Sequence, residues 1–157
     1  MHSLDTLFLD RDGVINVKLE ERYVRNSNEF EFMQGALVAI SKLSKLFKRI
    51  LIVTNQQGIG KGIMTEDDLN LLHSFMTSEI GKLNGKIDKI YFCPHLDTEN
   101  CNCRKPNPGM INQAIADFPD IDCQNSYLIG DSDSDIEAGN RMNLNTVKVD
   151  NEYTLAK

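Results

Sequence analysis

The sequence lacks the features that mark several large classes of protein. No apolar stretch is long enough to span a bilayer, and the first five residues have neither the cationic nor the apolar region of a signal peptide. Basic residues are not in excess, because 17 Lys and Arg stand against 23 Asp and Glu, a net charge of −6. A nucleic-acid-binding protein usually has a basic face. These absences argue against a membrane protein and a nucleic-acid-binding protein, and they favour a cytoplasmic location.

Repeats, low-complexity tracts and long linkers are also missing, and a length of 157 residues suits a single domain over 1–157. We expect this domain to be a monomer. Disulfides are rare in cytoplasmic proteins, so the four cysteines are expected to be metal ligands or free thiols. The negative net charge does not exclude an anionic substrate, because a metal ion and a few local cations dominate the field of a small site.

Strand-like and helix-like runs alternate along the chain. Strands are expected at 6–10, 49–54, 87–93, 126–130 and 146–149. Helices are expected at 35–47, from Thr65, from Pro108, and from 133 or 134 to 141. Thr65 is the expected cap of the second of these helices, and the acidic residues 66–68 fall in its first turn. The helix from Thr65 should carry Leu69, Leu72, Met76 and Ile80 inward. This alternation predicts a three-layer, Rossmann-like α/β fold, a parallel sheet with helices on both faces and no large inserted cap domain.

Three of the expected strands end at or just before a polar residue: Asp10, Thr54 and Asp131. In parallel α/β sheets, ligands bind at the carboxyl ends of the strands, so these residues point to one site. Asp12 follows two residues after Asp10, and the two carboxylates can face the same way. The Asp10 side chain, the Asp12 carbonyl and Asp131 are therefore predicted ligands of one Mg²⁺, which prefers oxygen donors.

Together these side chains fit the chemistry of phosphate-ester hydrolysis. Asp10 is the predicted nucleophile, and its attack on phosphorus gives an aspartyl-phosphate. Asp12 can protonate the leaving alcohol and later activate water. Thr54, the Asn55 amide and Lys105 can stabilise the transferring phosphoryl group. Alone, each residue has an ordinary explanation as a turn, a cap or a surface charge, but their coincidence at successive strand ends favours catalysis.

Four segments carry a family resemblance: Asp10-Arg11-Asp12-Gly13-Val14-Ile15-Asn16, Val53-Thr54-Asn55-Gln56, Arg104-Lys105-Pro106 and Gly130-Asp131-Ser132-Asp133-Ser134-Asp135. They resemble the four motifs of the haloacid-dehalogenase-like phosphatases, and the match covers most of the chain. The resemblance implies a Mg²⁺-dependent phosphomonoester hydrolase that acts through an aspartyl-phosphate, with the roles given above. It also implies substrate contacts from Asn55, Gln56, Gln57 and Arg104, and a supporting role for Asp135.

A second metal site is predicted after the third strand. Cys93-Pro94-His95 is followed, after a short hydrophilic loop, by Cys101-Asn102-Cys103. Three thiols and an imidazole in two close pairs fit a tetrahedral structural zinc, which leaves no open position for chemistry. Since Arg104 and Lys105 follow at once, the zinc is expected to fix both. The alternative is free thiols and a surface histidine, and Cys123 is left over as a free thiol.

The zinc loop resembles one branch of this family, which contains the D-glycero-D-manno-heptose 1,7-bisphosphate phosphatases and the histidinol-phosphate phosphatases. The resemblance implies a small phosphorylated sugar or amino-alcohol substrate. The segments at 16–32 and 54–66 resemble the heptose enzymes, which remove the 7-phosphate, and the segment 17–32 is expected to cover the site as a flap. The short zinc loop and Asn125-Ser126-Tyr127 resemble the histidinol-phosphate enzymes, which are the alternative.

A receiver module is the main rival class, because it also combines a parallel sheet, a phosphorylated aspartate, Mg²⁺, a threonine and a lysine. In that fold, however, the nucleophile follows the third strand, where this chain has Cys93. A phosphate-binding Walker loop is excluded, since Gly62 follows Lys61 where that motif requires Ser or Thr.

Overall fold

The computed structural model describes residues 4–19, 23–95, 101, 103–150 and 154–155. Its elements, in chain order, are β1 (Leu4–Leu9), α1 (Ala36–Leu46), β2 (Phe47–Asn55), α2 (Gln57–Gly60), α3 (Glu66–Gly81), β3 (Lys89–Cys93), α4 (Gly109–Asp117), the 3-10 helix η2 (Cys123–Asn125), β4 (Tyr127–Gly130), α5 (Asp133–Arg141) and β5 (Asn145–Lys148).

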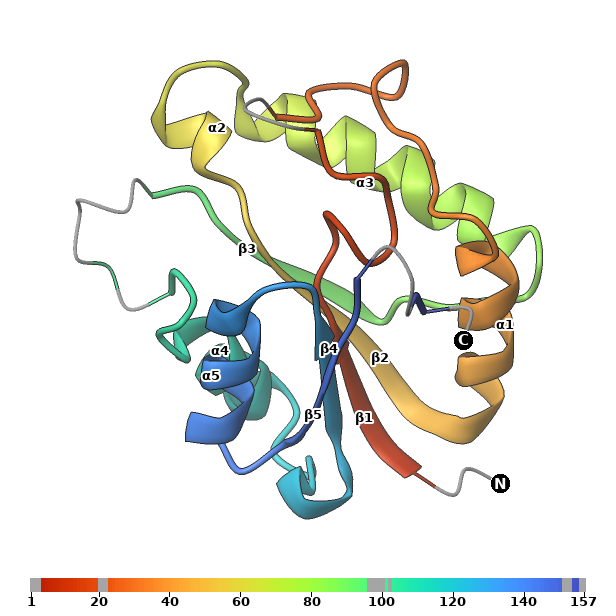
Figure 1. Cartoon of the computed structure of the whole chain (residues 1–157), viewed down its shortest axis with the longest axis vertical. Helices are drawn as coiled ribbons and strands as arrows, with labels where there is room; N and C mark the ends of the chain where they lie inside the picture. Colours follow the sequence, from red (N-terminus) through yellow and green to blue (C-terminus); the bar gives the residue numbers. More distant parts are fainter. Residues whose placement is uncertain (1–3, 20–22, 96–100, 102, 151–153, 156–157) are drawn as a thin grey trace.

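The strands form one parallel sheet in the order β3-β2-β1-β4-β5 (Figure 1). From β1 the chain adds β2 and β3 on one side and then β4 and β5 on the other. As a result β1 and β4, which are far apart in sequence, lie side by side, with Leu9 opposite Ile129. A sheet of this kind binds ligands where the order reverses, at the carboxyl ends of the central strands. The predicted Rossmann-like fold is confirmed.

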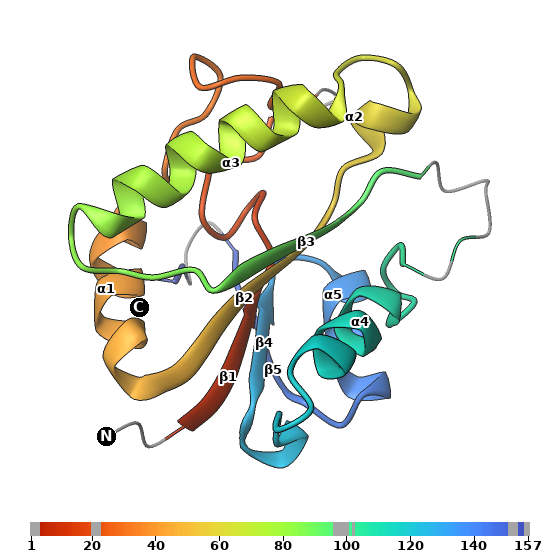
Figure 2. The ribbon, with the colours of Figure 1, turned by 180° about the vertical axis from the view of Figure 1, so that it is seen from behind.

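Helices cover both faces of the sheet, with α1 and α3 on one face and α4 and α5 on the other (Figures 1 and 2). Alternate residues of β1 serve the two layers: Leu7 and Leu9 pack in the core under α1 and α3, and Phe8 packs in the core under α4 and α5. The four central residues of β2, 50–53, are fully buried, as expected for a strand covered on both faces.

The boundaries differ from the sequence prediction by one or two residues. Phe47 was expected to end the first helix, but it is extended (φ −102°, ψ 135°) and begins β2, because its buried ring packs with the strand's core. Pro108 caps α4 instead of opening its first turn. The capping threonine of α3 is confirmed: the Thr65 hydroxyl accepts from the Asp68 amide, and the Asp68 carboxylate accepts from the Thr65 amide.

Between β1 and α1 the described residues form no helix or strand, only isolated bridges of Asn16 with Asp12 and with Phe32. The segment lies against the fold through Val24 and Phe30, which are buried in the core under α1 and α3. The described residues therefore hold no large cap domain, as predicted. None of the described helices combines the length and the apolar character needed to cross a membrane.

Candidate active site

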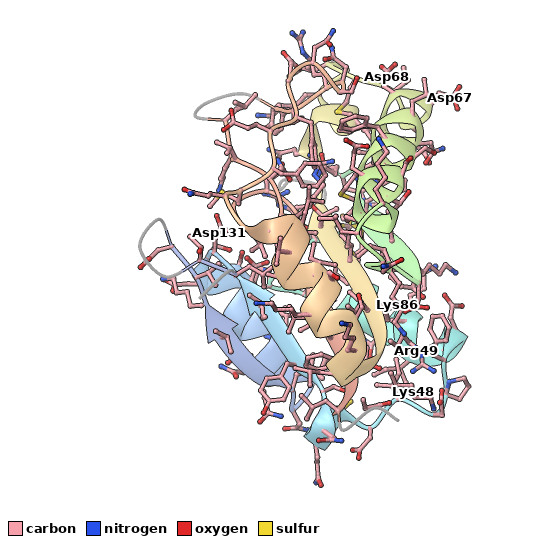
Figure 3. The ribbon with its side chains drawn as sticks, turned by 90° about the vertical axis from the view of Figure 1, so that its right-hand side faces the viewer. Lys48, Arg49, Asp67, Asp68, Lys86 and Asp131 are labelled. Atoms are coloured by element: carbon pink, nitrogen blue, oxygen red, sulfur yellow. A yellow bond between two sulfur atoms is a disulfide. The ribbon has the colours of Figure 1, made fainter. Side chains whose placement is uncertain are left out.

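A cavity of about 310 Å³ opens at the carboxyl ends of the central strands. Figure 3 shows Asp131 at this end of the sheet and Lys48 and Arg49 at the opposite end. The cavity brings together eight of the predicted site residues, which come from four separate segments of the sequence: Asp10, Asp12, Asn55, Gln57, Arg104, Lys105, Asp131 and Asp135.

Lys105 is the cation at the floor of this cavity. Its Nζ donates to Asp10 Oδ1 (3.0 Å), to the Val53 carbonyl (3.1 Å) and to the Asp135 carboxylate, and the side chain is buried. Burial alone would lower the pKa of Lys105, but the two carboxylates outweigh it and raise the pKa, so the lysine is protonated. A surface position, the ordinary explanation for a lone lysine, is excluded.

Three carboxylates, Asp10, Asp131 and Asp135, have ligand oxygens within 4.8 Å of one another. Burial, followed by the neighbouring carboxylates, raises the pKa of Asp10 well above its usual range, although Lys105 opposes this. Burial also raises the pKa of Asp131. A divalent cation would relieve this crowding of buried negative charge, and carboxylate oxygens are the donors that Mg²⁺ prefers. The residues present fit a magnesium site; Asp10 and Asp131 are predicted ligands, and Asp135 joins their cluster.

Two glycines make room for this cluster. A Cβ at Gly13, whose φ of +87° already favours glycine, would lie 2.0 Å from Asp131 Oδ2. A Cβ at Gly130 would lie 2.3 Å from the Asp135 Cβ. The backbone therefore approaches both carboxylates more closely than any residue with a side chain permits.

Asp12 lies in a different electrostatic environment. Its Oδ1 accepts from Arg11 Nη2 (2.9 Å) and Asn16 Nδ2 (2.8 Å). Burial alone would raise the pKa of Asp12, but Arg11 and the hydrogen bond from Asn16 lower it overall. Two carboxylates two residues apart thus differ in the direction of their pKa shifts, a pattern common in catalytic pairs.

Two predicted residues lie below the cavity instead of lining it. Thr54 and Gln56 are both almost fully buried. Gln56 Nε2 donates to Thr54 Oγ1 (3.0 Å) and to Asp12 Oδ2 (3.2 Å). Gln56 therefore lies within reach of Asp12 and connects it to β2, and direct contact of Gln56 with a substrate stays a prediction.

The rim of the cavity contains residues that the motifs did not single out. Lys18, Leu19, Tyr23 and Val24 line it from the predicted flap, and Lys18 Nζ is 4.0 Å from Asp131 Oδ2. The expected position of the 17–32 segment over the site could have indicated them, but no motif separates Lys18 from other surface lysines.

Arg104 also lines the cavity, and its buried Nη1 makes no hydrogen bond with the described part of the chain. Tyr23 lies nearby, and its hydroxyl accepts from Gln57 Nε2 (3.1 Å). A hydrogen bond with Lys61, partly opposed by burial, lowers the pKa of Tyr23. The rim is thus positively charged, with an arginine donor available for a ligand.

The four predicted zinc ligands, Cys93, His95, Cys101 and Cys103, also come together, with all four donor atoms within 4.8 Å of one another. Cys101 Sγ lies 3.4 Å from Cys93 Sγ and 3.7 Å from Cys103 Sγ. His95 Nδ1 lies 3.6 Å from Cys93 Sγ and 3.3 Å from Cys103 Sγ. Tetrahedral zinc with ordinary bond lengths separates sulfur from sulfur by about 3.8 Å and sulfur from nitrogen by about 3.5 Å, so these four separations fit one ion.

The sulfur atoms of Cys93 and Cys103 are at disulfide-bonding distance. This contact differs from the expectation that none of the cysteines forms a disulfide. Zinc is bound by thiolates, so the Cys93–Cys103 contact does not fit the zinc site, which requires both cysteines to be reduced. Cys123 lies outside the cluster as a free, half-buried thiol, as predicted.

Comparison with known proteins agrees with this geometry. A family model described as HAD-hydrolase-like matches residues 102–156. The D-glycero-alpha-D-manno-heptose-1,7-bisphosphate 7-phosphatase of Campylobacter jejuni is 44% identical over 150 residues, 93% of this chain and 82% of that protein. The D-glycero-beta-D-manno-heptose-1,7-bisphosphate 7-phosphatase of Helicobacter pylori is 39% identical over 140 residues, 88% and 79% of the two chains.

The solved D,D-heptose 1,7-bisphosphate phosphatase of B. bronchiseptica, in complex with magnesium and phosphate, superimposes with a TM-score of 0.88. It is 29% identical, and the superposition covers 98% of this chain and 83% of that one. Sequence, fold and the arrangement of the cavity therefore agree. The chain belongs to the haloacid-dehalogenase-like phosphatases, in the branch that contains the heptose-bisphosphate phosphatases.

Proposed function

We propose that this chain removes the 7-phosphate of D-glycero-D-manno-heptose 1,7-bisphosphate. One observation carries this proposal. The same cavity contains the three carboxylates of Asp10, Asp131 and Asp135 and the side chain of Arg104, whose buried Nη1 has no acceptor among the described residues. The curated relatives named for this reaction support it.

In the first half-reaction, Asp10 attacks phosphorus. Its Oδ1 accepts from Lys105 Nζ and from the Arg11 amide (2.9 Å), and these two bonds fix the plane of the carboxylate. The bond between phosphorus and the sugar oxygen breaks, and Asp12 donates a proton to the departing alcohol. The phosphate brings negative charge beside Asp12, which raises the tendency of that carboxylate to hold a proton.

In the second half-reaction, Asp12 accepts a proton from the water that attacks phosphorus in the aspartyl-phosphate. The bond between Asp10 and phosphorus breaks, so the Asp10 carboxylate is restored and inorganic phosphate leaves. Lys105 balances the charge of the phosphoryl oxygens, and the Asn55 amide donates to them. A hydrogen bond from the Thr54 hydroxyl stays a prediction, because that side chain is buried below the cavity. A magnesium ion bound by Asp10, Asp131 and the Asp12 carbonyl would supply further charge neutralisation and keep Asp10 ionised.

The charge of the rim favours a bisphosphate over histidinol phosphate. Arg104 presents a planar fork that suits phosphate oxygens. Lys18 adds positive charge 4.0 Å from Asp131, and Lys61 adds it 5.3 Å from the centroid of the Tyr23 ring. A second phosphate complements this charge, whereas the ammonium group of histidinol phosphate would be repelled by it.

We further propose that Cys93, His95, Cys101 and Cys103 bind a structural zinc, and that residues 1–157 form one domain. The four fitting separations support the zinc. The single sheet, to which every described strand belongs, supports the one domain.

The test is a comparison of kcat/KM with Mg²⁺ for both anomers of heptose 1,7-bisphosphate and for histidinol phosphate. We expect kcat/KM for one bisphosphate anomer to exceed kcat/KM for histidinol phosphate by at least about 10³-fold, which corresponds to about 4 kcal/mol. Equal or greater kcat/KM for histidinol phosphate would contradict the proposed substrate.

A second experiment tests whether Arg104 binds the second phosphate of the substrate. Arg104→Met should lower kcat/KM for the bisphosphate by about 10²-fold and much less for heptose 7-phosphate, which lacks the second phosphate. Lys82→Met, at an exposed lysine beyond the end of α3, is the charge-matched control and should change neither value. Equal losses on both substrates would show that Arg104 does not bind the second phosphate.

A further inference from the structure

Arg11, between the two aspartates of the first motif, is the largest fully buried side chain in the described residues. A buried guanidinium stays charged and therefore needs acceptors. Its Nε has no hydrogen-bond partner among the described residues, and the Phe30 ring at 5.9 Å offers only a weak contact. Two directional contacts remain, one at each terminal nitrogen: Nη2 with Asp12 and Nη1 with His73.

His73 is the only polar side chain on the buried face of α3, among Leu69, Leu72, Met76 and Ile80. Its Nε2 lies 3.1 Å from Arg11 Nη1. Because arginine can only donate, this Nε2 must be the unprotonated nitrogen of a neutral imidazole. The histidine thus acts as an acceptor for a buried cation, which an apolar side chain at this position could not do.

The other end of the guanidinium holds a carboxylate of the site. Arg11 Nη2 donates to Asp12 Oδ1, and the Asp12 side chain is 25% exposed toward the cavity. His73, Arg11 and Asp12 therefore form a continuous chain from α3 to the cavity, joining residues 62 positions apart in sequence.

We propose that His73 is a positioning residue for the acid/base step: by fixing Arg11, it holds the Asp12 carboxylate in line with the leaving oxygen. This inference rests on the proposed role of Asp12 in phosphate-ester hydrolysis. Without an acceptor at residue 73, the guanidinium keeps one directional contact and can turn about it. Asn16 and Gln56 also donate to the Asp12 carboxylate, so loss of the fixed Arg11 donor shifts the carboxylate and does not release it. A displacement of about 1 Å at a reacting group can cost about 10²-fold in rate.

The experiment compares two esters that need the acid to different extents. An alkyl phosphate, such as a sugar phosphate, has a poor leaving group that requires protonation, whereas p-nitrophenyl phosphate departs as a stable phenolate. The quantity measured is kcat/KM, which includes only the steps up to release of the alcohol. His73→Leu should lower it about 30- to 100-fold for the sugar phosphate and less than about 5-fold for p-nitrophenyl phosphate.

The second readout is whether a different side chain with an acceptor at the same position restores kcat/KM. His73→Gln places an amide oxygen near the position of Nε2 and should keep kcat/KM within about 3-fold of the original protein. His73→Asn is equally polar but too short to reach Arg11, and it should reproduce the defect of His73→Leu. This pair keeps the test decisive if His73→Leu does not fold.

Leu72→Val is the matched control, because Leu72 is a buried neighbour on the same helix whose apolar side chain offers Arg11 no hydrogen-bond acceptor. It should lower the thermal midpoint without a preference between the two esters. Two results would overturn the inference. One is an equal loss of kcat/KM on both esters in the His73 variants, as in this control, and the other is a kcat/KM in His73→Gln as low as in His73→Asn.

Asp12→Asn separates this inference from the proposed function. It should lower kcat/KM for the sugar phosphate by about 10²- to 10⁴-fold and for p-nitrophenyl phosphate by less. Equal losses in Asp12→Asn would refute the acid role of Asp12 itself. A dependence on the leaving group in Asp12→Asn but not in the His73 variants would overturn the His73 inference alone.

Discussion

At the scale of single residues, the cavity is built from buried charges that neutralise one another. Lys105 is held between Asp10 and Asp135, and Arg11 is held between Asp12 and His73. A buried charge without a partner costs several kcal/mol, so each cation stabilises the anions beside it only while the pairing is complete. Substitution of either partner therefore affects both stability and activity.

The nucleophile can be tested with a near-isosteric change. Asp10→Asn should abolish turnover, by at least about 10³-fold, because an amide does not form the acyl phosphate. The fold should persist, since asparagine keeps an acceptor for the Arg11 amide and removes a buried carboxylate from a crowded cluster. Phosphate release and the thermal midpoint are the two measurements. Turnover above about a tenth of the original would rule out Asp10 as nucleophile.

The buried histidine predicts a pH-dependent stability. Burial, and then the charge of Arg11, lower the pKa of His73 from 6.5 to about 3. Between these values the unfolded chain binds a proton at this residue that the folded chain does not, so the folded protein loses stability as the pH falls below 6.5. The loss attributable to His73 is about 1.4 kcal/mol per pH unit.

Urea unfolding at pH 6.5 and 5.0 measures this effect. The free energy of unfolding should fall by about 2 kcal/mol more in the original protein than in His73→Gln over this interval. The two proteins are compared because other groups titrate in both, so only the difference between their changes in unfolding free energy reports on His73. Identical pH dependence in both would show that the imidazole has an ordinary pKa in the fold.

Sequence reasoning located some of these residues better than others. Asp10 and Asp131 were identifiable because strand ends, which a local pattern reveals, converge at one edge of a parallel sheet. Lys105 lies between β3 and α4, and only the family motif indicated it. The burial of Gln56 and the Arg11–His73 contact were not identifiable, because each depends on side-chain packing between elements far apart in sequence. His73 belongs to no motif, and its partner could not be inferred from the sequence of its own helix.

At the scale of elements, the segment between β3 and α4 connects the two predicted metal sites. Cys93 ends β3, and Lys105 follows Cys103 by two residues. The Lys105 amide also donates to Asn55 Oδ1 (3.1 Å), which ties the segment to the end of β2. Any change that loosens the cysteine cluster should therefore displace Lys105.

Cys101→Ser tests this connection. We expect about one zinc per original chain by elemental analysis and loss of zinc in the variant. A loss of about 2 kcal/mol would lower the thermal midpoint by roughly 4–8 °C, and kcat should fall as Lys105 shifts. Cys123→Ser, at the thiol outside the cluster, is the control. Should a reducing agent lower the midpoint while Cys101→Ser does not, the segment is held by the Cys93–Cys103 disulfide instead.

The sequence analysis did not predict the two short helices α2 and η2. The other elements were predictable from periodicity and capping. The predicted strand 49–54 lies within β2, and the acidic first turn and capping Thr65 of α3 agree with the structure. The errors lie at boundaries where tertiary packing decides, as at Phe47, whose apolar side chain suits either the end of a helix or the start of a buried strand.

At the scale of the whole molecule, the strand order sets the site. β1 and β4 supply Asp10 and Asp131 only because the crossover connections bring these strands together. The predicted metal site therefore joins two halves of the chain, and a bound cation should stabilise the fold as a whole.

Magnesium binding should be visible in thermal unfolding. At a concentration of one hundred times its Kd, an ion that binds only the folded state contributes about 2.7 kcal/mol, which raises the midpoint by roughly 5–10 °C. Asp131→Asn should remove this rise. Asp133→Asn, at an exposed carboxylate on the neighbouring helix that pairs with Lys148, should keep it. No magnesium-dependent rise in the original protein would contradict the metal site.

The pairing of β1 with β4 also means that the chain can be split into two fragments, each of which supplies part of the site. A cut in the exposed turn after α3, near Asn84, would leave Asp10 and Asp12 on one fragment and Lys105 and Asp131 on the other. Neither fragment could form a phosphoenzyme alone. Phosphate release would begin only when the fragments reassembled through the central sheet, so the split chain could report, by its own turnover, that two fused partners had met.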